Sequence, residues 1–232
     1  NPAALWLTFA FSIFPARWLI VRSTGSSEPL FIASIIASVY YFNKKNYLWA
    51  GIWGAIAQLT KSYGILLFLA YFWAYFAPKL KETATNHLSH WVRFLKPLAF
   101  IPLILIPLTL IGIFFFYKNV FNDFFAYFNS GDNIHLFFPP FQIFNYSQPW
   151  VGTFWLEEVI FVYLFGFMGL LQLIKDKKST LAWIVGIFFA STLFVSHRDI
   201  IRYSLPVVPF LYAAFEKILT KREFKITLIF LL

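Results

Sequence analysis

Residues 98–117 read LAFIPLILIPLTLIGIFFFY and contain no charged side chain. A membrane-spanning helix needs about 20 predominantly apolar residues, and this stretch has that length. The whole chain has a similar character: of its 232 residues 60% are hydrophobic, 23% are aromatic and only 12% are charged. Its mean hydropathy is +0.69, whereas soluble domains carry about 25% charged residues. The composition predicts an all-α, polytopic integral membrane protein.

Other apolar runs resemble this one and predict about eight transmembrane helices in a single membrane domain over residues 1–232. Several runs are shorter than about 20 residues, so we expect some of them to be kinked or to span incompletely. The runs lie at about 3–14, 29–43, 47–60, 62–78, 98–117, 157–174, 180–196 and 203–219, and another begins near 226.

The positive-inside rule orients these helices, because Lys and Arg gather in short cytoplasmic loops. Strict alternation of the runs places thirteen of the 19 basic residues on one side, which we assign to the cytoplasm: Lys44, Lys45, Lys79, Lys81, Arg93, Lys96, Lys175, Lys177, Lys178, Lys217, Lys221, Arg222 and Lys225. This topology predicts a multi-pass membrane protein. We expect it to lie in a bacterial plasma membrane with its active face extracytoplasmic.

Several functional classes are excluded by what the sequence lacks. The net charge is +9, but the basic residues are dispersed between apolar runs rather than gathered in a patch, so we expect no nucleic-acid partner. Because the chain has no cysteine, it has no disulfide, no thiolate metal site and no cysteine nucleophile. The absence of GxxxxGK[ST] and GxGxxG gives no support to ATP or NAD chemistry. Neither end has the features of a natural terminus, so we expect a fragment.

Two polar segments interrupt the apolar pattern. Residues 79–97 predict a basic amphipathic segment on the cytoplasmic surface. Its His87 and His90 lack a third ligand nearby, so we assign no metal. Residues 118–156 predict a long extracytoplasmic loop whose many aromatic side chains favour packing on the membrane face.

The charges left on the outer side are the candidates for chemistry, since topology does not explain them. Arg198 and Arg202 are four residues apart and would share a helix face, where two guanidinium groups can clamp a phosphate. Lys61 would add a third positive charge. The alternatives are that Arg198 pairs with Asp199 or a loop carboxylate, and that Arg202 reaches the lipid head groups.

The outer carboxylates have similar alternatives. Glu28 opens a predicted helix, where the helix dipole favours it; it could also act on a hydroxyl or hold a basic side chain in position. Glu157 and Glu158 read as a helix start at the interface. His197 could tune a phosphate site or be an ordinary interfacial histidine. We take His197, Asp199 and Trp155 as residues that could line the site.

Three motifs resemble those of GT-C fold glycosyltransferases, in particular the GPI mannosyltransferase II family and its bacterial relatives. The first is Phe14-Pro15 followed by SSEPLF at 26–31. The second is the small-residue run AGIWGAIAQLTK at 50–61, and the third is RYSLP at 202–206 with Pro209. Each motif is degenerate, but together they cover most of the chain in the family's order.

The resemblance implies a GT-C-like membrane module that transfers a hexose, such as mannose, with inversion. The donor would be a polyprenyl-phosphate sugar and the acceptor a glycan, lipid or protein on the outer face of the bilayer. Lys61, Arg198 and Arg202 would bind the donor phosphate, and Glu28 would support the site. Beyond that donor no cofactor is implied, and a divalent metal is left open.

One departure concerns the catalytic base. The family's acidic residue usually lies in a first outer loop that precedes the Ser-Glu signature, and this sequence has no such loop. We therefore expect the base to be absent and the fragment alone to be inactive. The competing interpretations are a transporter or flippase for lipid-linked saccharides, a polymer ligase, and a non-catalytic membrane subunit.

Overall fold

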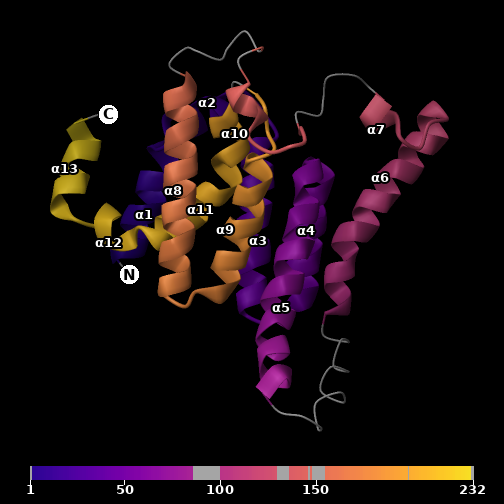
Figure 1. Cartoon of the computed structure of the whole chain (residues 1–232), viewed down its shortest axis with the longest axis horizontal. Helices are drawn as coiled ribbons and strands as arrows, with labels where there is room; N and C mark the ends of the chain where they lie inside the picture. The colour runs from indigo at the N-terminus through magenta and orange to yellow at the C-terminus, as the bar shows by residue number, and fades with distance from the viewer. Residues whose placement is uncertain are drawn as a thin grey trace. The chain divides into compact units, whose positions relative to one another are not determined.

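The computed structural model describes residues 2–85, 100–129, 136–145, 147, 155–197 and 199–230 (Figure 1). Within these ranges the regular elements are helices, and the β-structure consists of an isolated bridge between Leu136 and Val195. The all-α prediction is confirmed for the described residues. The chain forms two compact units, one of residues 1–28 and 135–232 and the other of residues 29–134.

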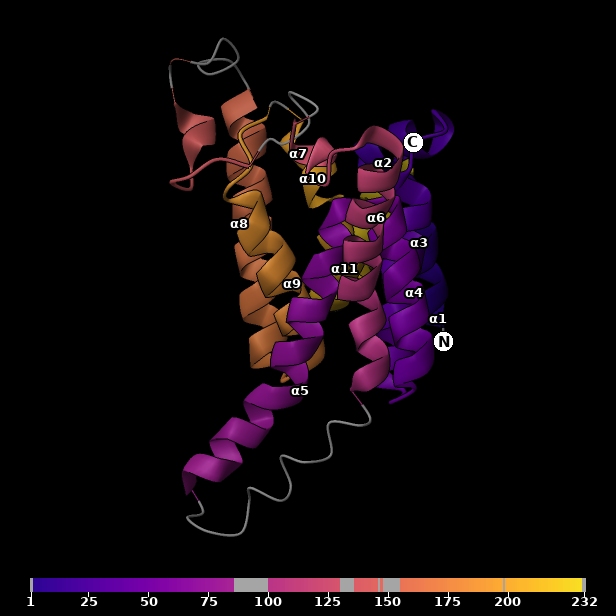
Figure 2. The same cartoon turned by 90° about the vertical axis from the view of Figure 1, so that its right-hand side faces the viewer.

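The first unit contains both ends of the described chain. Its centre is the hairpin of α8 and α9, which lie side by side in Figures 1 and 2. The helices of this unit are α1 (Pro2–Ile13), α2 (Ala16–Ser23), the 3₁₀ turn η5 (Gln142–Phe144), α8 (Trp155–Lys175), α9 (Ser179–Thr192), α10 (Ile200–Ser204), the 3₁₀ turn η6 (Leu205–Val207), α11 (Val208–Ala214), α12 (Glu216–Leu219) and α13 (Arg222–Phe230).

The turn between α8 and α9 defines one end of this unit. It contains Lys177 and Lys178 and follows Lys175, the last residue of α8; Lys178 Nζ donates a hydrogen bond to the carbonyl of Ala213 at 2.9 Å. Because α8 and α9 run antiparallel from this turn, the start of α8 and the end of α9 lie at the opposite end of the hairpin (Figure 1). The segment that follows α9 leads there into α10, which packs on both helices.

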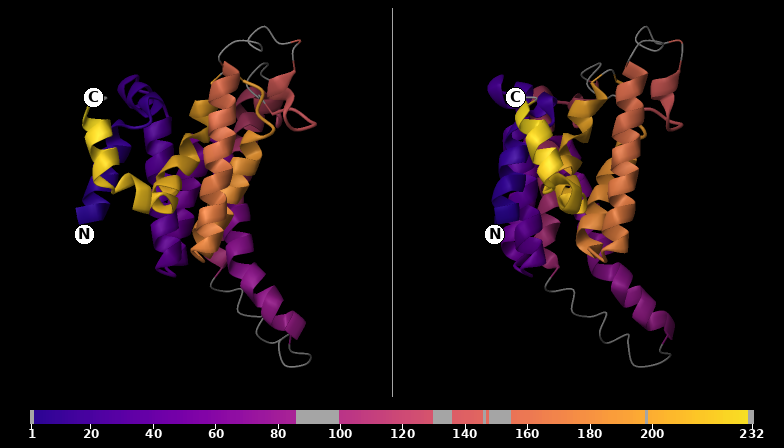
Figure 3. Two further views of the ribbon diagram at one scale, coloured as in Figure 1. Left: turned by 60° about the vertical axis from the view of Figure 1, so that its left-hand side comes forward. Right: turned by 90° about the vertical axis from the view of Figure 1, so that its left-hand side faces the viewer.

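The C-terminal helices pack on α1 in the same unit, as Figure 3 shows for α12 and α13. The indole of Trp6 donates a hydrogen bond to the carbonyl of Leu219 at 2.7 Å. The hydroxyl of Tyr212 donates to the carbonyl of Phe14 at 2.9 Å. These bonds satisfy two polar groups within an apolar cluster around the buried Ala10, as low-dielectric surroundings require.

Part of the predicted outer loop packs on the end of this unit that lies opposite the turn between α8 and α9. Backbone N–H groups of Phe137 and Phe141 donate to carbonyls that follow α9, each at 2.8 Å. In η5, Ile143 is buried against α8 and α10 with Val159 and Ile200. The loop prediction over 118–156 also includes the end of α6 and the short helix α7, while residues 130–135, 146 and 148–154 lie outside the described ranges.

The second unit is a helical bundle around α4. Its elements are α3 (Glu28–Asn43), whose first residue belongs to the other unit, α4 (Tyr47–Thr60), the 3₁₀ turn η1 (Ser62–Gly64), α5 (Ile65–Thr85), the 3₁₀ turn η4 (Ile101–Ile104), α6 (Leu105–Phe121) and α7 (Ala126–Asn129). Small residues let α4 approach its neighbours closely. A Cβ added at Gly51 would lie 2.2 Å from the carbonyl oxygen of Pro102 in η4.

A buried hydrogen-bonded chain joins three helices of this unit. Ser38 on α3 donates to the carbonyl of Ala50 on α4 at 2.7 Å, and its oxygen lies 2.7 Å from the hydroxyl of Tyr71 on α5. Ser38 and Tyr71 are both fully buried or nearly so. The hydroxyls therefore satisfy each other where water does not reach them.

The expectation of about eight transmembrane helices is wrong, because fewer helices have the length and apolar composition that a span needs. Among the described residues, two helical stretches, Ile101–Phe121 and Leu156–Lys175, are long and apolar enough to cross a membrane. A third qualifies if α1 and α2, bent by 68° at their junction, count as one span. The remaining apolar runs do form helices, but the 16 residues of α3 and the 14 of α4 and of α9 are fewer than the roughly 20 that a span needs.

The physical reason is helix length. At 1.5 Å per residue, helices of 14–16 residues extend only about 21–24 Å, less than the hydrocarbon thickness of about 30 Å. Runs that look continuous in sequence are also broken: the run from 203 is divided by the 3₁₀ turn η6, which contains Pro206. The amphipathic segment at 79–97 is described only as far as Thr85, as the end of α5, and the rest lies outside the described ranges.

Candidate functional site

The end of the first unit opposite the turn between α8 and α9, which we call the site end, contains an ion pair between residues far apart in sequence. The Nε of Arg202, on α10, donates a hydrogen bond to Oε1 of Glu28 at 2.5 Å. The Glu28 side chain is only 3% exposed, whereas that of Arg202 is 41% exposed. The carboxylate thus holds the guanidinium from the protein side, and the open part of Arg202 faces outward from the pair.

The same carboxylate affects the charge of its partner. The hydrogen bond that Arg202 donates to Glu28 raises the pKa of Arg202 above its ordinary value, and burial opposes this only in part. Arg202 therefore stays positively charged at any physiological pH.

A second ion pair lies beside the first. Nη2 of Arg17, on α2, donates to Oδ2 of Asp199. Asp199 directly precedes α10, and its carbonyl accepts the backbone N–H of Arg202 at 3.0 Å. One turn of backbone therefore joins the two pairs. We refer to Arg17, Glu28, Asp199 and Arg202 as the paired-charge cluster.

Helices α2, α3 and α10 bring these four groups together from distant parts of the sequence. The bend between α1 and α2 turns the chain so that α2 packs against α10. Glu28 begins α3, where the positive end of the helix dipole favours a carboxylate. Asp199 stands at the start of α10 for the same electrostatic reason. Two helix starts thus supply the two acids, and α2 and α10 supply the two arginines.

The segment before α10 adds further polar groups. The backbone N–H of Asp199 donates to Nδ1 of His197 at 3.0 Å, so Nδ1 is an acceptor and the neutral ring carries its proton on Nε2. The ring of His197 packs edge-on against Tyr203, with centroids 5.6 Å apart. Ser196 is buried, and its hydroxyl has no hydrogen-bond partner among the described residues. The same holds for Nε of Arg17.

The predicted site residues divide into three groups. Glu28, His197, Asp199 and Arg202 come together at one end of the first unit. Lys61 belongs to the second unit, at the C-terminal end of α4. Arg198 lies outside the described residues. Trp155 is the first residue of α8, and its side chain is outside the description.

The residue that the sequence interpretation missed is Arg17. It is not among the thirteen basic residues assigned to the cytoplasm, and nothing in the local sequence links it to Asp199, 182 positions later. The signal that could have found it is its place two residues after Pro15, in the Phe14-Pro15 motif quoted above. Glu157 and Glu158 do lie in the first turn of α8, as the interpretation of a helix start expects.

The charges of the paired-charge cluster balance, which limits what it can bind. Two guanidinium groups face two carboxylates, so the four groups carry no net charge when all are ionised. Ligand binding would then depend on directed hydrogen bonds, donated by exposed N–H groups and accepted by carboxylate oxygens, rather than on excess charge. Phosphate oxygens and sugar hydroxyls are ligands of that kind. Among the described residues no group of three His, Asp or Glu side chains could hold a metal ion.

In comparisons with known proteins, no family model, no curated protein and no solved structure matches the chain.

Proposed function

We propose that the chain is the membrane module of a glycosyltransferase that moves a hexose, such as mannose, from a polyprenyl-phosphate donor to an acceptor on the extracytoplasmic face. The observation that carries this proposal is the pairing of Arg202 with the buried Glu28. It leaves a permanently charged guanidinium 41% exposed beside a second Arg–carboxylate pair. The motif resemblance of residues 14–31, 50–61 and 202–209 supports the same class of reaction.

The proposed chemistry assigns a role to each group. The acceptor hydroxyl attacks the anomeric carbon on the face opposite the phosphate, the bond from that carbon to the phosphate oxygen breaks, and polyprenyl phosphate leaves with the electron pair. Arg202 stabilises the charge that grows on the phosphate, which is where electrostatic catalysis has most effect. Glu28 accepts the hydrogen bond of Arg202 and acts as a positioning residue.

The proton of the acceptor hydroxyl needs a carboxylate, and we propose Asp199 for this role in place of the expectation that the chain lacks the base. Of the two acids in the paired-charge cluster, Asp199 is the more accessible, at 17% exposure against 3% for Glu28. Asp199 is therefore the acid open to an acceptor. Arg198 remains proposed, from the sequence, as a further phosphate ligand, whereas Lys61 belongs to the second unit and is not assigned to this site.

The test is sugar transfer in membranes that contain the protein, with radiolabelled polyprenyl-phosphate mannose and polyprenyl-phosphate glucose as donors. The expected result is label in a membrane-bound or polymeric product with one of the two donors. Arg202→Ala should reduce the rate by a factor of 100 or more, roughly the effect of removing one charged donor from a transition-state site. Arg222→Ala, an exposed arginine on α13, is the matched control and should keep the rate.

Binding provides a second readout. The purified chain should bind polyprenyl phosphate about tenfold or more tightly than the neutral polyprenol, because a charged hydrogen bond contributes about 1.5–3 kcal/mol. Arg202→Gln should remove that difference. Equal affinity of the unaltered chain for the phosphate and the alcohol would overturn the phosphate assignment.

A further inference from the structure

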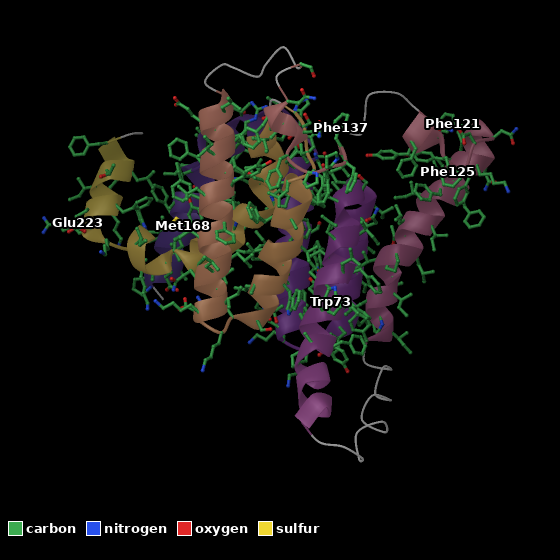
Figure 4. All side chains as sticks on the ribbon, in the orientation of Figure 1. Trp73, Phe121, Phe125, Phe137, Met168 and Glu223 are labelled. Atoms are coloured by element: carbon green, nitrogen blue, oxygen red, sulfur yellow. The ribbon has the colours of Figure 1, made fainter. Side chains whose placement is uncertain are left out.

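The far end of α6 carries an aromatic surface that the proposed function does not use. The stretch Ile101–Phe121 is long and apolar enough to cross a membrane, and only 11% of its most apolar window is buried inside the structure. At its end the chain reverses and enters α7. Figure 4 labels Phe121 and Phe125 on the two sides of this reversal.

The reversal is built by local hydrogen bonds. Asn122 adopts a left-handed conformation with φ 55°, which ends α6 and which Asn tolerates better than most residues. The carboxylate of Asp123 accepts the backbone N–H of Phe125 and the side-chain amide of Asn129, each at 2.8 Å. A side-chain oxygen that accepts an N–H at a helix start stabilises that start. The direction of α7 is therefore fixed by this short sequence.

The reversal brings rings from the two helices into one cluster. Phe124 lies 5.3 Å from Phe114 and 5.5 Å from Phe115, between ring centroids, and Phe128 lies 5.7 Å from Phe114. The hydroxyl of Tyr127 lies 3.1 Å from that of Ser62 in η1, which ties α7 to the start of α5. Rings and tether both belong to the second unit.

The cluster is apolar and exposed on one side. Phe125 and Phe128 are 54% and 51% exposed. Over the same short stretch, Lys118, Asn122, Asp123 and Asn129 supply polar groups, and all except the partly exposed Asp123 are exposed. Five phenylalanines favour an apolar environment, while an ionised Lys and Asp disfavour the hydrocarbon core. The depth that satisfies both is the boundary between head groups and acyl chains.

We propose that the turn from α6 to α7, residues 114–129, is an interfacial anchor whose partner is the lipid bilayer at head-group depth. This inference goes beyond the proposed function and does not depend on it. It assigns one boundary of the membrane to Lys118–Asp123. From there α6 continues into the hydrocarbon, and α7 lies along the surface with its phenylalanines toward the acyl chains.

The absence of cysteine allows a direct measurement of depth, because a single introduced cysteine carries the only label. We would place a nitroxide at Phe125→Cys and, separately, at Phe128→Cys in the chain reconstituted into vesicles of phosphatidylcholine and phosphatidylglycerol. The measured quantity is the ratio of collision rates with oxygen, which partitions into the bilayer, and with a nickel chelate, which stays in water.

Two control positions in the same unit calibrate the ratio. Leu108→Cys has the same 54% exposure as Phe125 but lies within α6, and should give the highest ratio. Lys44→Cys, exposed in the turn between α3 and α4, should give the lowest. The anchor predicts ratios for residues 125 and 128 between these two values.

Every other outcome overturns the proposal. A ratio equal to that of Lys44→Cys would place α7 in water, and one equal to that of Leu108→Cys would place it in the hydrocarbon core. Low collision rates with both reagents would mean that protein covers the cluster, and dipolar broadening between labels would then identify a second copy of the chain. All four labelled sites are exposed. Because Phe125 and Phe128 also contact other rings of the cluster, each is labelled separately so that the other ring stays in place.

Discussion

The pairing of Glu28 with Arg202 makes a stability prediction that can be worked from the structure. Glu28→Gln keeps the shape of the side chain but removes the charge that Arg202 Nε contacts at 2.5 Å. Breaking a fully buried pair costs about 3–5 kcal/mol. Because Arg202 is 41% exposed and water can solvate it, the loss should be smaller, about 1.5–3 kcal/mol, as for one charged hydrogen bond.

The assay is reversible unfolding in mixed detergent micelles, followed by tryptophan fluorescence, with Arg202→Gln and the double variant measured alongside. The coupling free energy of this cycle isolates the pair from other effects of each substitution. We expect a coupling of about 1–2 kcal/mol. Glu157→Gln, the same change at an exposed position in the first turn of α8, should cost less than about 1 kcal/mol.

A coupling within about 0.3–0.5 kcal/mol of zero, the range in which independent sites add, would refute the reasoning. It would mean that Arg202 is held by other groups and that Glu28 stabilises α3 only as a residue at its N-terminus. The proposed positioning role of Glu28 would fall with it, while the anchor at α7 would be unaffected.

Further predictions concern packing and topology. Gly51→Ala should lower the free energy of unfolding by about 1–3 kcal/mol, because the added Cβ would meet backbone atoms of η4. Gly112→Ala, where a Cβ meets nothing within 4 Å, should instead raise it by up to about 1 kcal/mol. Both are read from the same detergent unfolding curves. Ser38→Ala should cost about 1–3 kcal/mol, since it removes a buried donor and leaves the tyrosine hydroxyl on α5 without its contact. A reporter fused after Lys178 should read as cytoplasmic and one inserted within 130–133 as external; the reverse would place the paired-charge cluster on the wrong face.

The sequence predicted the positions of helices well, but it predicted less well which helices are long enough to cross a membrane. The apolar runs at 29–43 and 47–60 match α3 and α4 closely. Hydrophobicity alone could not decide whether they cross the bilayer, because an apolar run is needed equally for a buried helix and for a span. The short runs became spans in the prediction, whereas the structure leaves two or three stretches of sufficient length.

The candidate site shows a similar division. Helix-end charges on the outer side directed attention to Glu28, Asp199 and Arg202, since a charge beside an apolar run needs an explanation. The pairing was not predictable from spacing: Arg202 and Arg198 were expected to act together because they are four residues apart. Arg198 lies outside the described residues, so their joint action stays a prediction; the described partner of Arg202 is Glu28, 174 positions away, in the role of holding a basic side chain.

By itself the sequence determined the all-α class, the apolar character and the turns that carry lysine, because these follow from composition and from the local preferences of the backbone. Tertiary structure alone decided that Arg17 meets Asp199 and that Phe124 and Phe128 fold back on α6. The reason is physical. An ion pair or an aromatic cluster depends on the direction in which the chain returns, and that direction is set by a bend after α1 and by one left-handed residue after α6.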